Sequence, residues 1–388
     1  MIKEKIKENC EVTQKKLKLK LKPKFKKILL IIGIILILLL VLFGLYVNKR
    51  NALSSLGYSD KAIDSIMKKF KTSYVEEQGE NKMLNAAFES KDYQEDNLEN
   101  YAKIEYQDQE DIVKNVNALL EKGYKTSEIS LILSRGSNED VTEFAKREKV
   151  DYLEEFLSVD YAKLKNYDRY VAYQDLENED AETTVLYVNL DFDKEDYVDP
   201  LEITEFDQYV LVNKHRQLTA DYVPDDLVEF KEEDTKVDET VEATEEVVKA
   251  FEEMKAAAAK EGLTLMVNSG YRSYQDQEEI MQIYLDAYGQ NYVDNYIAKP
   301  GFSEHQTAMS IDVASATVDT FVESDEYSWM MDNAYLYGFI LRYPRSKEDI
   351  TGYKCEAWHY RYVGKEIAKY IKENNITYDE YYMMFLDK

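Results

Sequence analysis

The stretch ETVEATEEVVKAFEEMKAAAAKEGLTLMVN (239–268) joins a helix pattern directly to a strand pattern. Residues 239–261 carry one apolar stripe, and their four consecutive alanines favour a helix intrinsically. Gly262 suits the C-terminal cap of this helix, and residues 263–268 predict a short buried strand. The stripe consists of Val241, Val247, Val248, Phe251 and Met254.

Helices and strands continue in mixed order on both sides of this pair. Further helices are predicted over 272–298 and 363–386, while β-branched and aromatic runs predict the strands. Mixed order of this kind indicates an α+β fold, with a small, mainly antiparallel sheet flanked by helices. The other predicted strands are TTVLYVNLDF (183–192), QYVLVNKHRQL (208–218), 309–314 and 338–343.

Residues 28–47, ILLIIGIILILLLVLFGLYV, contain no charged side chain. At about 1.5 Å per residue, a helix of this length matches a hydrocarbon core of about 30 Å. A buried helix of a soluble protein rarely stays apolar on all sides for so long. A cleaved signal peptide usually has a core of about 7–15 residues and a small-residue cleavage site, whereas Asn48-Lys49-Arg50 follows here. We therefore expect a transmembrane helix.

The charges around this helix predict its orientation. Residues 1–27 contain eleven lysines, and only Lys49 and Arg50 closely follow the apolar stretch. The positive-inside tendency then predicts a cytoplasmic N-terminus, a single pass through the cell membrane, and residues 48–388 outside the cell. Those outer residues carry a large excess of acidic side chains within a net charge of −27 for the whole chain, which argues against nucleic-acid binding.

Two cysteines, Cys10 and Cys355, exclude a disulfide framework and a Cys-rich zinc finger. The predicted topology places them in different compartments, so we expect no intramolecular disulfide.

The region after the apolar stretch is predicted to be helical and partly repetitive. LSSLGYSDKAIDSIMKKF (53–70) and LLEKGYKTSEISLILSRG (119–136) share a Gly-Tyr pair, a polar run and two isoleucines three residues apart, and FLSVDYAKLKNYDRY (156–170) is a weaker third copy. This pattern favours a small helical unit used two or three times. Its predicted N-caps are Ser59 and either Thr126 or Ser127.

Two of the three histidines lie beside carboxylates. His305 belongs to SEHQTAMSID (303–312), and His359 belongs to EAWHYRY (356–362), whereas His215 is expected at the surface or in a loop. Two imidazoles and one carboxylate can hold Zn²⁺ in three tetrahedral positions and leave the fourth open for water. Zinc lowers the pKa of that water to about 7, and a further carboxylate must then take its proton.

The spacing within the two motifs constrains the backbone around such a site. His305, Asp312 and His359 supply the three ligands, and Glu356 supplies the base. The separation between His305 and Asp312 is odd, so a regular strand would point them to opposite faces. The chain must therefore turn or bulge near His305, and the spacing of Glu356 and His359 indicates a loop or turn between them.

Five blocks within residues 205–388 resemble the VanY-type D-alanyl-D-alanine carboxypeptidases of the zinc-dependent M15 peptidase family. The family pattern Ser-x-His-x-x-Gly-x-Ala-x-Asp falls on residues 303–312, and Glu-x-Trp-His falls on residues 356–359. The blocks are LVNKHRQLTADYVPDDLV (211–228), SGYRSYQDQ (269–277), KPGFSEHQTAMSIDV (299–313), GFILRYPRSKEDITGY (338–353) and EAWHYRYVG (356–364).

The resemblance implies a role for each matching residue. It makes Glu356 the catalytic base and Arg272 the residue that recognises the terminal carboxylate of the peptide, a group that guanidinium pairs with bidentately. Gln277 and Ser303 resemble residues that hold the terminal residue, and Trp358 is expected to pack the metal loop. The implied zinc ligands are His305, Asp312 and His359.

Three residues depart from the family pattern. Ala308 replaces a glycine and would be strained in a left-handed backbone conformation. Ser310 replaces an alanine, and its hydroxyl needs a partner if it is buried. Ala357 replaces a proline that is often present. None of these changes removes a ligand.

The sequence therefore predicts a membrane-anchored, extracellular zinc carboxypeptidase that removes C-terminal D-alanine from peptidoglycan stem peptides. An LD-carboxypeptidase acting on tetrapeptide stems and a catalytically silent wall-binding module are the alternatives. The predicted parts are a basic cytoplasmic tail (1–27), a transmembrane helix (28–47), a helical stalk that spaces the enzyme from the membrane (48–182) and an M15-like domain (183–388).

Overall fold

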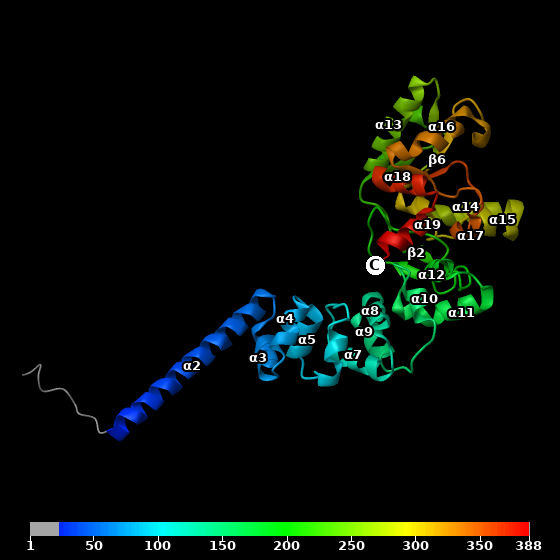
Figure 1. Ribbon diagram of the computed structural model, residues 1–388. Coiled ribbons are helices and arrows are strands. Elements are labelled where there is room, and N and C mark those ends of the chain that lie inside the picture. Colours follow the sequence, from blue (N-terminus) through cyan, green and yellow to red (C-terminus); the bar gives the residue numbers. More distant parts are fainter. Residues whose placement is uncertain (1–22, 388) are drawn as a thin grey trace, which may run out of the picture. The chain divides into compact units, whose positions relative to one another are not determined.

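The computed structural model describes residues 23–387, so Cys10 and most of the predicted cytoplasmic tail lie outside the described residues. The chain forms two compact units, each described here by itself (Figure 1). Unit 1 comprises residues 23–134 and 141–149, and unit 2 comprises residues 135–140 and 150–387.

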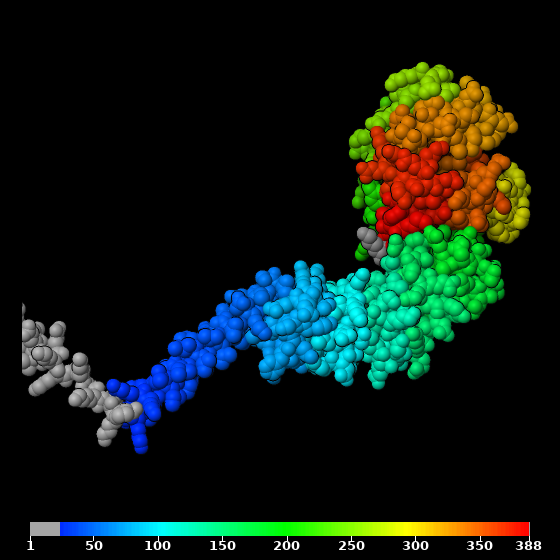
Figure 2. Space-filling view, in the orientation of Figure 1, coloured from blue at the N-terminus to red at the C-terminus, as the bar shows by residue number. Residues whose placement is uncertain are grey.

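Unit 1 begins with α2 (Pro23–Ser55), a helix that contains the whole predicted apolar stretch. None of its most apolar window is buried, and Figure 2 shows the helix bare over most of its length. Its length and composition are sufficient to cross a bilayer. Gly57, with φ of 83°, ends the helix in a left-handed turn, in which the Tyr58 N–H donates to the Leu53 carbonyl.

Short helices follow α2, as the sequence predicts for this region. Ser59 caps the first of them, because its side chain accepts a hydrogen bond from the Ala62 N–H. The prediction of Thr126 or Ser127 as a cap is wrong, because the carbonyl of Lys125 accepts the first helical bond. The helices are α3 (Asp60–Lys68), α4 (Thr72–Gln78), α5 (Lys82–Glu89), η1 (Glu95–Asn97), α6 (Leu98–Tyr101), α7 (Ile112–Glu121), α8 (Thr126–Arg135) and α9 (Asn138–Phe144).

A buried tyrosine–asparagine pair marks the repeat and occurs once in each unit. In unit 1, the Tyr101 hydroxyl donates to Oδ1 of Asn117 over 2.5 Å. In unit 2, the Tyr170 hydroxyl donates to Oδ1 of Asn189 over 2.7 Å. A second asparagine amide donates to the same oxygen in each case, from Asn97 and Asn166 respectively. The repetition is therefore more extensive than the sequence motifs indicated.

The predicted strand at 183–192 is instead the helix α12 (Ala181–Asn189). Asp180 caps it by accepting a hydrogen bond from the Thr183 N–H. The helical spacing places Leu186 and Leu190 together in a core cluster with residues near the C-terminus. Packing of this face outweighs the strand propensity of the β-branched residues.

Unit 2 is an α+β structure, as predicted. Its helices are α10 (Leu153–Leu157), η2 (Leu164–Asn166), α11 (Tyr167–Glu177), α12, η3 (Glu232–Asp234), α13 (Glu245–Lys260), α14 (Tyr274–Tyr288), α15 (Gln290–Tyr296), η4 (Glu304–Thr307), η5 (Phe321–Glu323), α16 (Asp325–Asn333), η6 (Ala334–Tyr337), α17 (Glu348–Thr351), α18 (Lys365–Asn374), α19 (Tyr378–Tyr381) and η7 (Tyr382–Leu386). Its strands are β1 (Leu201–Ile203), β2 (Arg216–Leu218), β3 (Leu227–Glu229), β4 (Glu242–Thr244), β5 (Leu265–Ser269), β6 (Ser310–Ser315), β7 (Phe339–Leu341) and β8 (His359–Tyr362).

The long helix α13 begins later than the sequence pattern indicates. Residues Glu242–Thr244 form β4, which pairs with β3, and Thr244 caps the helix by accepting a hydrogen bond from the Val247 N–H. Of the strand predicted at 208–218, only the last three residues form a strand, β2, which pairs in parallel with β1.

A four-stranded antiparallel sheet of order β5-β6-β8-β7 forms the centre of unit 2. Alternate residues of β6 point to opposite faces. Ile311 and Val313 belong to the core that also contains Phe251 and Met254 of α13. Ser310 and Asp312 therefore point to the other face of the sheet, which is where the chemically active residues gather.

Candidate active site

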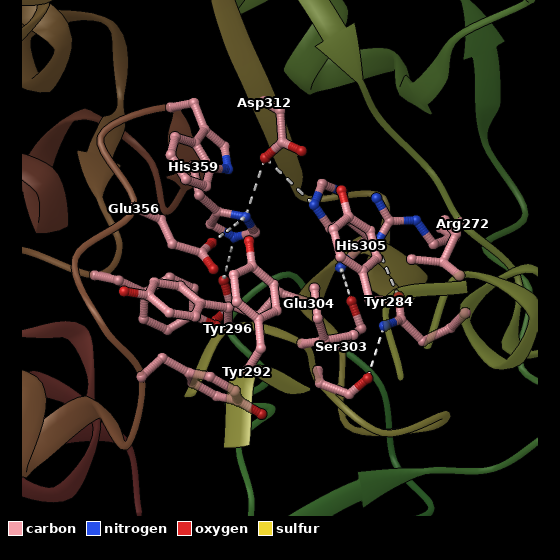
Figure 3. A pocket seen from close by; sticks show the side chains of 17 residues that line it. Arg272, Tyr284, Tyr292, Tyr296, Ser303, Glu304, His305, Asp312, Glu356 and His359 are labelled. Carbon is pink, nitrogen blue, oxygen red and sulfur yellow. Dashed lines mark hydrogen bonds and ion pairs between the residues drawn. The ribbon is translucent and has the colours of Figure 1, made fainter. Parts of the chain in front are cut away.

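Three predicted ligands meet on this face of the sheet (Figure 3). Asp312 of β6 lies opposite His359 of β8 in the strand register, and His305 comes from the turn η4 just before β6. Oδ1 of Asp312 lies 3.4 Å from Nε2 of His305 and 3.2 Å from Nδ1 of His359. The three ligand atoms lie within 4.8 Å of one another. The turn before β6 resolves the odd spacing, as predicted.

Each imidazole is oriented through its second nitrogen. Nδ1 of His305 lies 2.7 Å from the carbonyl oxygen of Gly270, so this nitrogen donates and Nε2 is left to bind a cation. Nε2 of His359 lies 3.5 Å from Oε2 of Glu304, which leaves its Nδ1 facing Asp312. A carbonyl or carboxylate behind a metal-binding histidine is the usual arrangement in metalloproteins.

Three features of these residues fit a divalent metal. Oδ1 of Asp312 is buried and has no hydrogen-bond partner among the described residues. Burial opposes ionisation of Asp312, but the two histidines lower the pKa of its carboxyl far below the usual range. An ionised carboxylate with two imidazoles is a donor set suited to zinc.

Glu356 is well placed to act as a base beside this cluster. Its Oε2 lies 3.9 Å from Nδ1 of His359, across the turn that precedes β8. Burial raises the pKa of Glu356 to about 8, the charges of Asp312 and Glu304 add to this effect, and His359 and Arg272 oppose it. A carboxylate with a pKa near neutrality can both accept and return a proton.

Arg272, Gln277 and Ser303 line the same pocket as the ligands. Nη1 of Arg272 donates to Oε1 of Gln277 over 2.8 Å, and Nη2 donates to Oγ of Ser269 over 3.1 Å. Gln277 also donates to the Ala298 carbonyl, so it orients the guanidinium. The Ser303 hydroxyl accepts a hydrogen bond from the His305 N–H and begins the turn η4.

A family model for VanY, D-alanyl-D-alanine carboxypeptidase, matches residues 240–365. YodJ of Bacillus subtilis (strain 168) is 40% identical to the chain over 195 residues, which are 48% of this chain and 71% of that protein. The chain belongs to the VanY family. Its C-terminal part is thus a carboxypeptidase domain, as the resemblance of the five blocks implied.

Two further relatives match a similar share of the chain. The bifunctional D-Ala-D-Ala dipeptidase and D-Ala-D-Ala carboxypeptidase VanXYC of Enterococcus gallinarum is 33% identical over 181 residues, which are 44% of this chain and 92% of that protein. Among solved structures, the LD-carboxypeptidase LdcB is 37% identical, with a TM-score of 0.44, and the match covers 48% of this chain and 92% of that chain.

The VanY domain contains a buried charge network that the sequence did not reveal. Glu304, Arg342 and Asp379 all have fully buried side chains. Arg342 Nε donates to Glu304 over 2.7 Å, and its Nη1 donates to Asp379 over 2.6 Å. Arg361 Nη1 lies 3.5 Å from Glu304. Arg342 and Arg361 thus both pair with Glu304, which lies directly behind the ligand His359.

Ser310 joins this network and so resolves one departure from the family pattern. Its side chain is completely buried, and its hydroxyl donates to Oε2 of Glu304 over 3.0 Å. The extra hydroxyl has the partner that burial requires.

The structure also places three residues that the sequence singled out. Trp358, which was expected to pack the metal loop, is 41% exposed and lines the pocket together with Glu356 and His359. His215 lies in the turn before β2 and outside the pocket, but it is buried and not at the surface, with Nε2 3.5 Å from Asp196. Cys355 is not among the ligand group.

The pocket also contains tyrosines that the motifs did not predict. Tyr343 packs its ring against His359, with 5.0 Å between ring centroids. Tyr284, Tyr292 and Tyr296 come from α14 and α15 and line the opposite side from the sheet. The four-residue spacing of Tyr292 and Tyr296 within α15 was the available signal, because residues four apart share a helix face.

Ala308 stands where the family has glycine, and its backbone adopts the left-handed conformation that is strained for alanine. Its φ is +56°, and its side chain is fully buried. We expect Ala308→Gly to raise the free energy of unfolding by about 1 kcal/mol, because glycine takes this conformation without a steric cost. Denaturation followed by tryptophan fluorescence measures the change, since both tryptophans, Trp329 and Trp358, lie in unit 2.

Ala258→Gly is the matched control for this prediction. Ala258 is also fully buried but lies within α13, so glycine there should lower stability by about 1 kcal/mol. Equal losses from both substitutions would contradict the strain at Ala308.

Proposed function

We propose that the chain is a membrane-anchored, extracellular zinc carboxypeptidase that removes the C-terminal D-alanine of peptidoglycan stem peptides. The main observation behind this proposal is that one pocket brings together His305, Asp312 and His359 with Glu356 and Arg272. Three ligands, a separate carboxylate and a guanidinium are together the parts that a metallo-exopeptidase needs.

The positions of these residues indicate what each of them does in the reaction. Zinc, when bound by the three ligands, polarises the scissile carbonyl and lowers the pKa of a water molecule. Glu356 accepts the proton of the attacking water and returns it to the leaving amine. Arg272 pairs with the free carboxylate of the peptide and so holds the scissile bond in place. Glu304 and the Gly270 carbonyl keep the two imidazoles oriented throughout.

The size of the pocket favours a small terminal residue. Its volume is about 140 Å³, similar to a cavity of about 150 Å³ that admits a single benzene ring. The guanidinium of Arg272 is fixed by Gln277 and Ser269, which favours a free carboxylate over an internal peptide bond. An alanine with a free carboxylate meets both requirements.

Stem peptides of two lengths test the proposed specificity. We expect the purified full chain to release D-alanine from a pentapeptide ending in D-Ala-D-Ala, with the products identified by mass. A chelator should abolish the reaction and added Zn²⁺ should restore it, because the ligands then lose and regain the ion. Cleavage of a tetrapeptide stem alone would favour LD-carboxypeptidase activity. Stoichiometric zinc without hydrolysis of either stem would favour a wall-binding module.

The two cysteines offer a test of the proposed topology. We expect a membrane-impermeant maleimide added to intact cells to label Cys355, which is partly exposed, and to label Cys10 only after permeabilisation. Variants Cys355→Ser and Cys10→Ser identify each signal. Labelling of Cys10 in intact cells would reverse the orientation that the lysines of the N-terminal tail predict.

A further inference from the structure

An exposed aromatic residue stands at the end of α3 in unit 1. Phe70 has 93% of its surface exposed, and it follows the basic residues Lys68 and Lys69 and precedes Lys71. We call residues 68–71 the basic turn. A phenylalanine so exposed contributes little to the packing of the unit.

The backbone of Phe70 is also strained. Its φ is +60°, and the Lys71 N–H donates to the Ile66 carbonyl, the hydrogen bond of a helix end that favours glycine at this place. Glycine does occupy the corresponding place at Gly57 and Gly123, each followed by the same type of bond. A bulky apolar side chain is therefore held outward at a position where the fold would prefer none.

The basic turn lies beside the end of the apolar helix. Phe70 and Lys68 line the same surface hollow as Tyr46 and Lys49 of α2. Arg50 holds this end of α2 against α3 through ion pairs with Asp60 and Asp64. Figure 1 shows α3 and α4 next to this end of α2. Because Tyr46 belongs to the last turn of the apolar stretch, Phe70 lies near the depth at which that stretch ends.

The charges of this surface suit phospholipid headgroups. Among the described residues, neither Lys49 nor Lys68 forms an ion pair, so both amines are free to meet phosphates. Lys71 pairs with Glu95, and Lys69 lies over the ring of Tyr93, 4.4 Å from its centroid. Aromatic and basic residues at the end of a membrane span are the usual anchors at a lipid interface.

We propose that the basic turn docks onto the outer leaflet of the membrane, with the Phe70 ring inserted among the lipid headgroups and Lys49 and Lys68 bound to phosphates. This proposal rests on the proposed anchoring by α2. It makes unit 1 a base that sits on the bilayer at a second point, in addition to the transmembrane helix.

Depth-dependent quenching in vesicles tests the docking. The full chain is reconstituted into vesicles of phosphatidylethanolamine and phosphatidylglycerol, with or without acyl chains brominated at the end next to the headgroup, and recovered by flotation. We expect most of the fluorescence that Phe70→Trp adds over the wild type to be lost in brominated vesicles. Glu121→Trp, at an exposed position of α7 in the same unit, is the matched control and should keep its added fluorescence.

Two results would overturn the proposal in distinguishable ways. If chains of the Phe70→Trp variant float with the vesicles but keep their added fluorescence, the docking proposal is wrong and the anchoring by α2 stands. Chains that fail to float would sink both. Phe70→Gly supplies a second measurement, because relief of strain should maintain or raise the unfolding temperature of the helices by circular dichroism. A lower temperature would mean that the ring serves the fold instead.

Discussion

Replacing Glu356 with alanine is expected to lower the rate of D-alanine release by about 10²–10⁴-fold, the range that general acid–base catalysis contributes. Glu356 lies 3.9 Å from His359 but is not one of the three grouped ligands. The substitution removes the only group proposed to take the proton from water and leaves the metal site complete. Turnover of a pentapeptide stem and the zinc content per chain are measured on the same preparation.

Asp312→Ala is the control that separates a base from a ligand. It should lose both turnover and zinc, because Asp312 lies between the two imidazoles. Glu356→Ala should lose turnover alone. A Glu356→Ala enzyme that retains its rate would remove Glu356 from the proposed mechanism, and one that loses zinc would make it a ligand.

The second large effect is expected at Arg342. Arg342→Met removes the positive charge between Glu304 and Asp379, all of them fully buried, and leaves two carboxylates without their main partner. Loss of one member of a buried ion pair costs about 3–5 kcal/mol. The free energy of unfolding of unit 2 should fall by that amount, as measured by denaturation with tryptophan fluorescence.

Two variants distinguish the network from a general effect of losing a cation. Lys249→Met breaks an exposed ion pair with Glu245 and should leave the denaturation midpoint unchanged. Glu304→Gln added to Arg342→Met should recover part of the lost stability, because one unpaired charge is then removed. A similar midpoint for Arg342→Met and Lys249→Met would contradict the importance of the buried network.

The network also predicts an effect on the metal. Glu304 lies behind Nε2 of His359, so Glu304→Gln should weaken zinc binding by about 10–100-fold, the usual effect of losing such a partner. Competition with a chelator measures this affinity without any reference to turnover. Unchanged affinity would limit Glu304 to a role in stability.

Local sequence patterns were sufficient to predict many of the helices, strands and site residues of this protein. The apolar residues of α2, the stripe of α13 and the ligand-bearing motifs could all be read directly, because each depends on residues close together in the chain. The spacing of His305 and Asp312 even required the turn that η4 provides. The family resemblance identified Glu356 and Arg272, which now line one pocket with the ligands.

The features that the sequence did not predict depend on contacts between residues that are far apart in the chain. α12 is a helix because Leu186 and Leu190 pack against C-terminal residues, and no local propensity contains that information. Glu304 lies in η4, Arg342 directly after β7 and Asp379 in α19, and their charges pair only after the sheet and α19 have come together. The left-handed backbone of Ala308 likewise follows from the turn that aims His305 at its partners. Side-chain chemistry and periodicity are local, whereas burial and pairing of charges depend on the complete packing of the domain.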